Sequence, residues 1–70
     1  MIKIESSARL GAVVREARKS QNLTQPQLAA MCGVGVRFIV DLEKGKPTCA
    51  IEKSLKVMQM LGLNLTITNK

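Results

Sequence analysis

Hydrophobic residues recur at helical spacing in four stretches of this chain. In the first stretch, residues 7–20, the apolar residues share one side of a helix. They are Leu10, Val13, Val14 and Ala17. Ser6 or Ser7 can cap the start of this helix. The residues off the apolar side, which we expect to be solvated, are Arg9, Arg15, Glu16 and Lys19.

The second stretch has its own start and stop signals. Thr24 and Gln27 have the spacing of a capping box, in which each side chain accepts from the other residue's backbone N–H. Pro26 falls in the first turn, where a missing N–H is tolerated. Gly33 favours a helix end through a positive φ. We therefore predict a short helix over residues 25–32.

The third stretch follows almost at once. Only Val34 and Gly35 separate Gly33 from a helix predicted over residues 36–44, which ends at Gly45. Two short helices joined by a tight turn that contains glycine are typical of a helix-turn-helix.

The chain ends with a fourth predicted helix, residues 50–61, and a strand. Residues 63–68, LNLTIT, alternate strictly between apolar and polar, with Leu63, Leu65 and Ile67 on one face. A lone strand leaves backbone groups unpaired. This one must pair with its copy in a dimer, with a partner protein, or with the N-terminal MIKI. The pattern predicts one mainly α domain of four to five helices with a short C-terminal strand.

Charge and composition narrow the functions. Eleven Lys and Arg residues against five Asp and Glu give a net charge of +6 in 70 residues, which favours a polyanion such as nucleic acid. There is no histidine, and Cys32 and Cys49 lack the spacing of a zinc site. The carboxylates are scattered, and no glycine-rich phosphate loop is present. We expect no metal, no cofactor and no enzymatic activity.

The sequence also predicts a cytoplasmic protein that makes no membrane contact. No apolar run approaches the about 18 residues of a membrane span, and the first residues do not resemble a signal peptide. Two free cysteines suit a reducing compartment. A membrane-surface helix at residues 7–20 is disfavoured, because its apolar side has no aromatic residue.

The outer face of the third helix is the candidate site. If Ile39 points inward, a turn of about 100° per residue places five residues on the far side. They are Val36, Arg37, Val40, Asp41 and Lys44. Residues near the start of a recognition helix meet base edges.

Each of these side chains has a possible contact with DNA. Arg37 can donate two hydrogen bonds to guanine, and Val36 can contact a thymine methyl. Val40 either packs on sugar and methyl groups or is simply exposed. Asp41 either accepts from a cytosine amino group or positions Arg37 from one turn away.

Phosphate contacts are expected around this helix. Gln25 lies at a helix start, where free N–H groups favour an anion. Lys44 and Lys46 flank the end of the third helix, although plain solvation is the alternative for both. The expected phosphate-contacting set is Thr24, Gln25, Gln27, Lys44 and Lys46.

Residues 10–48 resemble the Cro and phage-repressor (XRE) type of helix-turn-helix. The matching pieces are R-x-x-R/K around 15–19, LTQ-x-x-LA at 23–29, GV at 33–34 and I-x-x-LE-x-G at 39–45. The resemblance implies that Gln25 grips a phosphate and that Arg18 and Glu43 form an internal ion pair. It also implies a base-facing set of Gly35, Val36, Arg37 and Asp41. The family usually has polar residues at positions 35 and 36, so base readout here would depend on Arg37, apolar contact and DNA shape.

The C-terminal part resembles HipB-type antitoxins. The resemblance lies in KGKPTCAIEKSLKVMQMLGLNLTI, residues 44–67. It implies that the strand pairs with its twin across a homodimer, which binds its own operator DNA and holds a kinase-like HipA toxin. The expected function is therefore a repressor that serves as an antitoxin. The alternatives are a stand-alone phage-type or restriction-controller repressor, and a helical protein-interaction module.

Overall fold

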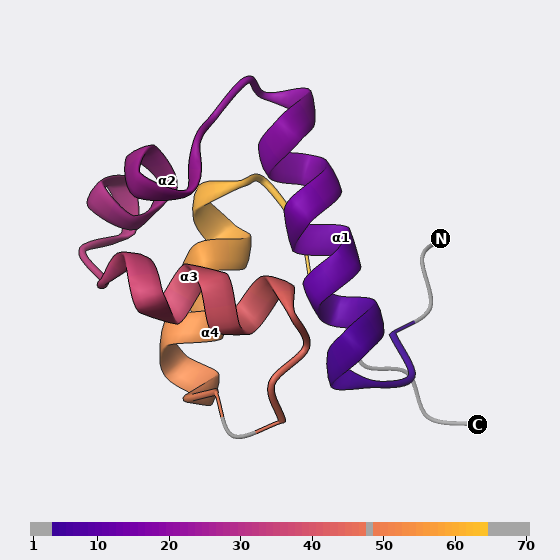
Figure 1. Cartoon of the computed structure of the whole chain (residues 1–70). Helices are drawn as coiled ribbons and strands as arrows, with labels where there is room; N and C mark the ends of the chain where they lie inside the picture. Colours follow the sequence, from indigo (N-terminus) through magenta and orange to yellow (C-terminus); the bar gives the residue numbers. More distant parts are fainter. Residues whose placement is uncertain (1–3, 48, 65–70) are drawn as a thin grey trace.

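A computed structural model describes residues 4–47 and 49–64 of the chain. Its four helices are α1 (Ser7–Ser20), α2 (Gln25–Cys32), α3 (Val36–Glu43) and α4 (Ile51–Met60) (Figure 1). The first two coincide with the expected ranges, whereas α3 and α4 are slightly shorter than expected. The described residues contain no strand, and none of their helices is long and apolar enough to cross a membrane. Most of the expected strand, including Leu65 and Ile67, lies outside the described residues.

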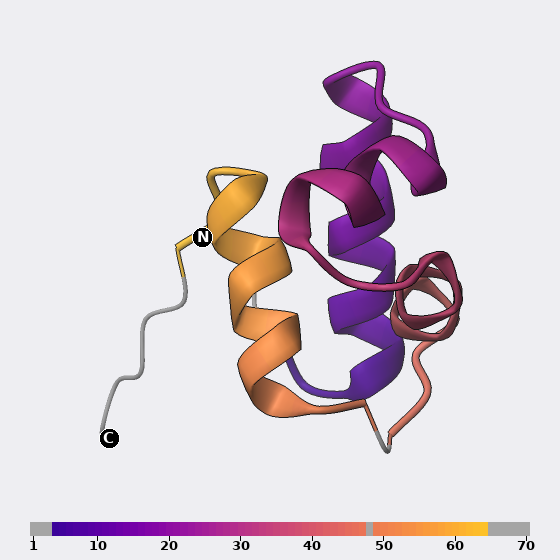
Figure 2. The ribbon, with the colours of Figure 1, turned by 90° about the vertical axis from the view of Figure 1, so that its left-hand side faces the viewer.

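The third helix lies at the outside of the bundle. α3 packs against both α1 and α2, and α2 also packs against α4. In Figure 1, α3 crosses the front of the molecule with α1 at one side and α4 behind it. Figure 2 shows α3 almost end-on at one edge of the molecule. One side of α3 is therefore held by other helices, while another side faces outward.

Local signals in the sequence explain where the first helices begin and end. The Ser6 hydroxyl accepts from the Arg9 backbone N–H at 3.1 Å and caps α1. Thr24 and Gln27 form both hydrogen bonds of the capping box, at 2.8 and 3.1 Å. Gly33 ends α2 with a φ of 68°, which an L side chain rarely adopts. The turn to α3 therefore depends on this glycine.

The core is built from small aliphatic and sulfur-containing side chains. Its buried members are Val14, Leu28, Ala29, Cys32, Ile39, Leu42, Val57, Met58 and Leu61. All four helices contribute to it, and Ile39 is fully buried as expected. Leu63 packs against the same cluster, and its backbone N–H donates to the Met58 carbonyl at 2.8 Å. The chain just after α4 therefore belongs to the folded unit.

A glycine allows α1 to approach α3 closely. A Cβ built on Gly11 would contact the Leu42 carbonyl oxygen and lie 2.7 Å from the Glu43 carbonyl oxygen. Both opposing atoms are backbone atoms, so they cannot move aside as a flexible side chain would. The absence of a side chain at position 11 thus fixes how the C-terminal end of α3 lies on α1.

Candidate nucleic-acid interface

The N-terminal end of α3 is open to solvent. Val36 is 42% exposed, and the Arg37 side chain is 82% exposed. Gly35 caps the helix, and a Cβ built there would meet nothing within 4 Å. The residues expected to face bases at this end of the helix can therefore reach a macromolecule without displacing other parts of the described chain.

The second turn of α3 is less open than the helical projection indicated. Val40 and Asp41 are half-buried, not fully outward, and the Asp41 side chain is only 17% exposed. The physical reason is that α3 packs against two helices, so its buried side is wider than a single stripe. Lys44, in contrast, is exposed.

Asp41 lies between two cationic side chains. Its carboxylate is 3.3 Å from the Arg37 Nε and 3.5 Å from the Lys46 Nζ. These contacts neutralise a charge that would otherwise repel phosphate, and they hold Arg37 from one turn away along the helix. Of the two roles considered for Asp41, the geometry favours the positioning of Arg37.

A polar network joins α1, α2 and α3. Arg18 donates from Nε to Glu43 Oε2 at 2.7 Å and from Nη1 to the Leu23 carbonyl at 2.7 Å. Gln25 donates to Glu43 Oε1 at 3.2 Å. The side chains of Arg18 and Glu43 are only 10% and 3% exposed. The network therefore links the start of α2 to the end of α3. The hydrogen bond to Glu43 fixes the position of the Gln25 side chain.

The other expected phosphate contacts divide into two groups. The side-chain oxygens of Thr24 and Gln27 are used in the capping box, although both residues are exposed at the start of α2. Lys44 and Lys46 are exposed at the end of α3. The structure thus brings both groups near the C-terminal end of α3, because Gln25 at the start of α2 donates to Glu43.

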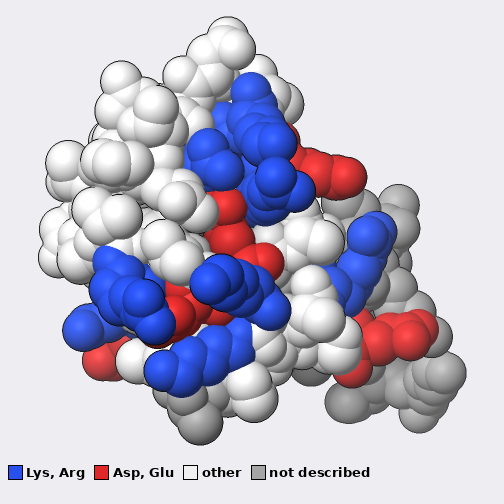
Figure 3. Space-filling model, in the orientation of Figure 1, with Lys and Arg blue, Asp and Glu red and all other residues white. Residues whose placement is uncertain are grey.

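The face that carries α3 bears basic residues of two helices. Figure 3 shows Lys and Arg side chains over both α1 and α3 in this view, while the surface over α2 is largely uncharged. The basic residues Arg9, Arg15 and Lys19 of α1 are exposed, as the sequence predicts. The spacing of polar residues identifies the polar side of α1, but it does not show which other helix that side lies next to.

Both cysteines contribute to the packing of the core. Cys32 is buried in the core and Cys49 is half-buried, and both are free thiols. Burial raises the pKa of the Cys32 thiol, and the positive charge of Lys56 opposes this in part. Among the described residues, no group of three or more His, Cys, Asp or Glu side chains is placed to hold a metal ion.

Comparisons with known proteins agree with this geometry. The sequence matches the helix-turn-helix family over residues 14–67. The chain belongs to this family. A relative from Sinorhizobium fredii, named as the uncharacterized HTH-type transcriptional regulator y4mF, is 55% identical over 65 residues, which cover 93% of this chain and 86% of the relative. The helix-turn-helix family places the chain among DNA-binding transcriptional regulators.

Solved structures of HipB have a very similar fold. HipB in a complex with an O4 20mer superposes with a TM-score of 0.88 at 25% identity, covering 99% of this chain and 97% of HipB. A HipA–HipB–O2–O3 complex gives a TM-score of 0.89 with the same identity and coverage. The predicted mainly α, repressor-like helix-turn-helix fold and the resemblance to HipB-type proteins are thereby confirmed.

Proposed function

We propose that this protein is a dimeric repressor that binds its own operator and serves as the antitoxin of a kinase-like, HipA-type toxin. The observation that carries the proposal is the open N-terminal end of α3, where Arg37 is 82% exposed within a helix-turn-helix. The similarity to HipB, a protein found in complexes with a 20mer and with HipA, supports the antitoxin role.

In this proposal α3 lies in the major groove. Arg37, held by Asp41, donates to the O6 and N7 of a guanine, which is the commonest specific contact in such sites. Val36 contacts a thymine methyl, and Val40 packs beside it on sugar or methyl groups. The Gly35 backbone, free of a side chain, lets the start of the helix approach the bases closely.

Phosphates on either side of this groove hold the helix in register. At the N-terminus of α2, the Thr24 and Gln27 N–H groups are used in the capping box and Pro26 has none, so a phosphate would meet the Gln25 N–H and the side chains of Thr24, Gln25 and Gln27. Lys44 and Lys46 follow the C-terminal end of α3, to which Gln25 links the start of α2, and they reach neighbouring phosphates. Such contacts position the protein without reading sequence.

Two copies of the chain would bind two half-sites. Recognition helices of a dimer meet successive major grooves about 34 Å apart, so the operator would be an inverted repeat. The proposed dimer contact is the C-terminal strand with Leu63, Leu65 and Ile67. Leu65 and Ile67 lie outside the described residues.

A stand-alone repressor is the second candidate. It uses the same DNA chemistry without a toxin, and it is favoured by the relative y4mF, which is named only as a transcriptional regulator. The two candidates differ in their protein partner alone. A helical protein-interaction module, the third possibility, would not bind DNA in a salt-dependent way.

One experiment distinguishes these functions. The tagged protein is purified from its native cell, the bound DNA fragments are sequenced, and the co-purifying proteins are identified by mass spectrometry. A shared inverted repeat together with a kinase-like protein supports the antitoxin, whereas the repeat alone supports the stand-alone repressor. DNA affinity that hardly changes between low and moderate salt contradicts both, because phosphate binding must weaken steeply with salt.

A further inference from the structure

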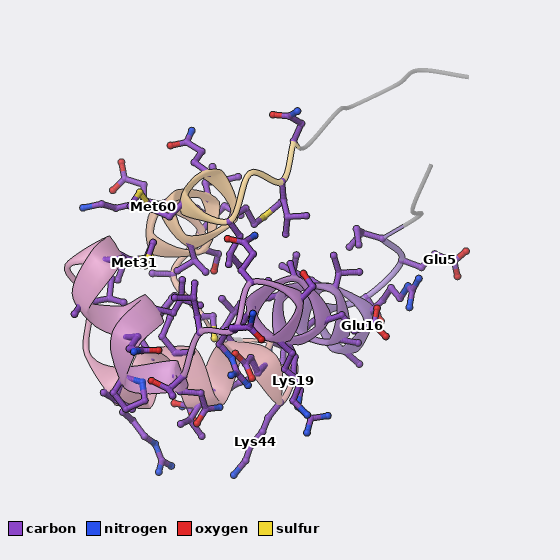
Figure 4. All side chains as sticks on the ribbon, turned by 90° about the horizontal axis from the view of Figure 1, so that it is seen from above. Glu5, Glu16, Lys19, Met31, Lys44 and Met60 are labelled. Carbon is purple, nitrogen blue, oxygen red and sulfur yellow. The ribbon has the colours of Figure 1, made fainter. Side chains whose placement is uncertain are left out.

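Two basic residues of α1, Arg15 and Lys19, follow the side of that helix that lies against α3. Arg15 and Lys19 are both exposed. In Figure 4, which views the molecule from above, the labelled Lys19 and Lys44 lie on one side, and the labelled Met31 and Met60 lie away from them. Figure 3 shows basic side chains over both helices on the same face, with carboxylates between the two groups.

Contacts between α1 and α3 explain this arrangement. Gly11, Arg15 and Arg18 follow at spacings of four and three residues, so they share one side of α1. The end of α3 touches that side twice, at Gly11 through backbone carbonyls and at Arg18 through the 2.7 Å ion pair with Glu43. Arg15 lies between these two points, and Lys19 lies one turn further. Their positions beside the recognition helix are therefore fixed by the fold.

Within the described part of the chain, no carboxylate forms an ion pair with Arg15 or Lys19. The neighbouring Arg18 is paired with Glu43, and Asp41 is occupied by Arg37 and Lys46. Two positive charges thus remain on the face that carries the recognition helix.

We propose that Arg15 and Lys19 bind the phosphodiester backbone of duplex DNA beside the bases that α3 reads. The inference rests on the proposed function and extends its contact surface from α2 and α3 to α1. The two residues are four positions apart, or about 6 Å along the helix axis. One DNA strand carries a phosphate per about 3.4 Å of its axis, so two charges at this spacing can serve one strand.

Such contacts raise affinity without reading sequence. A side chain that neutralises one phosphate releases about one counterion, which steepens the dependence of log Kd on log salt by about one. Loss of either contact should weaken binding to operator DNA and to random DNA by similar factors. This behaviour differs from that expected of Arg37, whose loss should affect the operator most.

Four variants test the proposal in matched pairs. Arg15→Gln is compared with Arg9→Gln, because Arg9 is an exposed arginine on α1 about a third of a turn away around the helix. Lys19→Gln is compared with Lys56→Gln on α4, which is also exposed. Each pair removes the same charge from the same residue type. Circular dichroism confirms that all four variants are folded.

Binding is measured on a duplex selected by the protein and on a random-sequence duplex of equal length. We expect Arg15→Gln and Lys19→Gln each to weaken binding about fivefold to tenfold near 0.1 M salt on both duplexes, and to lower the salt slope by about one. The variants Arg9→Gln and Lys56→Gln should bind like the wild type. Arg15→Lys, which keeps the charge, should retain most of the affinity.

The outcomes separate this inference from the function on which it rests. If the wild type prefers its selected duplex but Arg15→Gln and Lys19→Gln behave like their controls, the α1 contact is wrong and the operator function stands. A loss confined to the selected duplex also overturns it, because backbone contacts act on any sequence. If the wild type shows neither sequence preference nor salt dependence, the proposed function itself fails.

Discussion

In α3, Asp41 forms an ion pair with Arg37, which lies one turn earlier. A free arginine side chain loses much rotamer freedom when it binds a base. The carboxylate of Asp41 lies 3.3 Å from the Arg37 Nε and is only 17% exposed, so it favours side-chain conformations of Arg37 that keep this contact. Lys46 at 3.5 Å keeps the local charge positive. In the proposed complex with DNA, this arrangement would preorganise the base contact of Arg37.

Arg37→Ala should therefore affect sequence discrimination more than general affinity. We expect a loss of about 1–3 kcal/mol of binding free energy on the operator and relaxed preference at one base pair. The measurement is the Kd for the operator and for each single-base variant of it. Lys44→Gln is the control, and it should weaken binding to all duplexes alike. Equal losses of Arg37→Ala on operator and random DNA would contradict a base contact.

At this scale the sequence predicted the exposed residues better than the half-buried ones. Val36 and Arg37 follow directly from the projection around Ile39, and they are exposed. Asp41 and Val40 were placed outward but are half-buried. A helical projection gives angles around one axis, whereas burial depends on how many neighbours pack against the helix, and α3 has α1 and α2 on its sides.

Among the helices, the boundaries that carry side-chain signals were predictable. Thr24 with Gln27 marks the start of α2, and Gly33 marks its end. The start of α4 has no such signal, because Ala50 makes no side-chain cap. α4 begins one residue after the expected start, which is within the usual uncertainty for a helix end. Its end is marked by Gly62, which has a φ of 76°.

The resemblance implied the Arg18–Glu43 pair between α1 and α3, and the structure contains it. The close approach at Gly11 was not predictable, because a glycine within a helix gives no sign of what approaches it. On helix propensity alone, Gly11→Ala should stabilise the protein by up to about 1 kcal/mol. The added Cβ would instead press against the Leu42 and Glu43 carbonyls. Overpacking of this kind typically costs about 1–3 kcal/mol, and a shift of α3 would also strain the Arg18–Glu43 pair.

We therefore expect Gly11→Ala to lower the free energy of unfolding, measured in urea by circular dichroism. A loss of stability would show that overpacking against α3 outweighs the higher helix propensity of alanine, and a gain would show the reverse. Ala12→Gly on the exposed neighbouring position is the control, and it should cost about 1 kcal/mol through propensity alone. A more stable Gly11→Ala variant would show that α1 and α3 do not approach as closely as described.

Over the whole molecule, composition indicates the kind of partner to expect but not where the charge lies. The net charge of +6 indicates a polyanion, and the fold gathers basic side chains of α1 and α3 on one face. The order of elements and the helix-turn-helix were visible in the sequence because each depends on local spacing. The shared face depends on two long-range contacts, at Gly11 and Arg18, which no local pattern encodes.

Assembly is the property of the whole molecule that remains a prediction, and the structure allows a sharp test of it. Leu63 packs on the core, and its backbone N–H donates a hydrogen bond to the Met58 carbonyl. A chain that ends at Asn64 should therefore keep the described fold. Removing residues 65–70 takes away Leu65 and Ile67, the remaining apolar residues of the proposed strand. We expect this truncated chain to sediment as a monomer, because too little of the strand remains to pair.

The same truncation should weaken operator binding far more than binding to one half-site. Two linked half-sites gain about 10²- to 10⁴-fold in affinity over one, and a monomer forfeits that gain. A chain lacking only residues 69–70 is the control, since it keeps both Leu65 and Ile67. If the chain ending at Asn64 still sediments as a dimer and binds the full operator as the wild type does, the C-terminal strand is not the dimer contact. The contact would then lie on the described helices, where the exposed side chains of Met31 and Met60 are the first to be substituted.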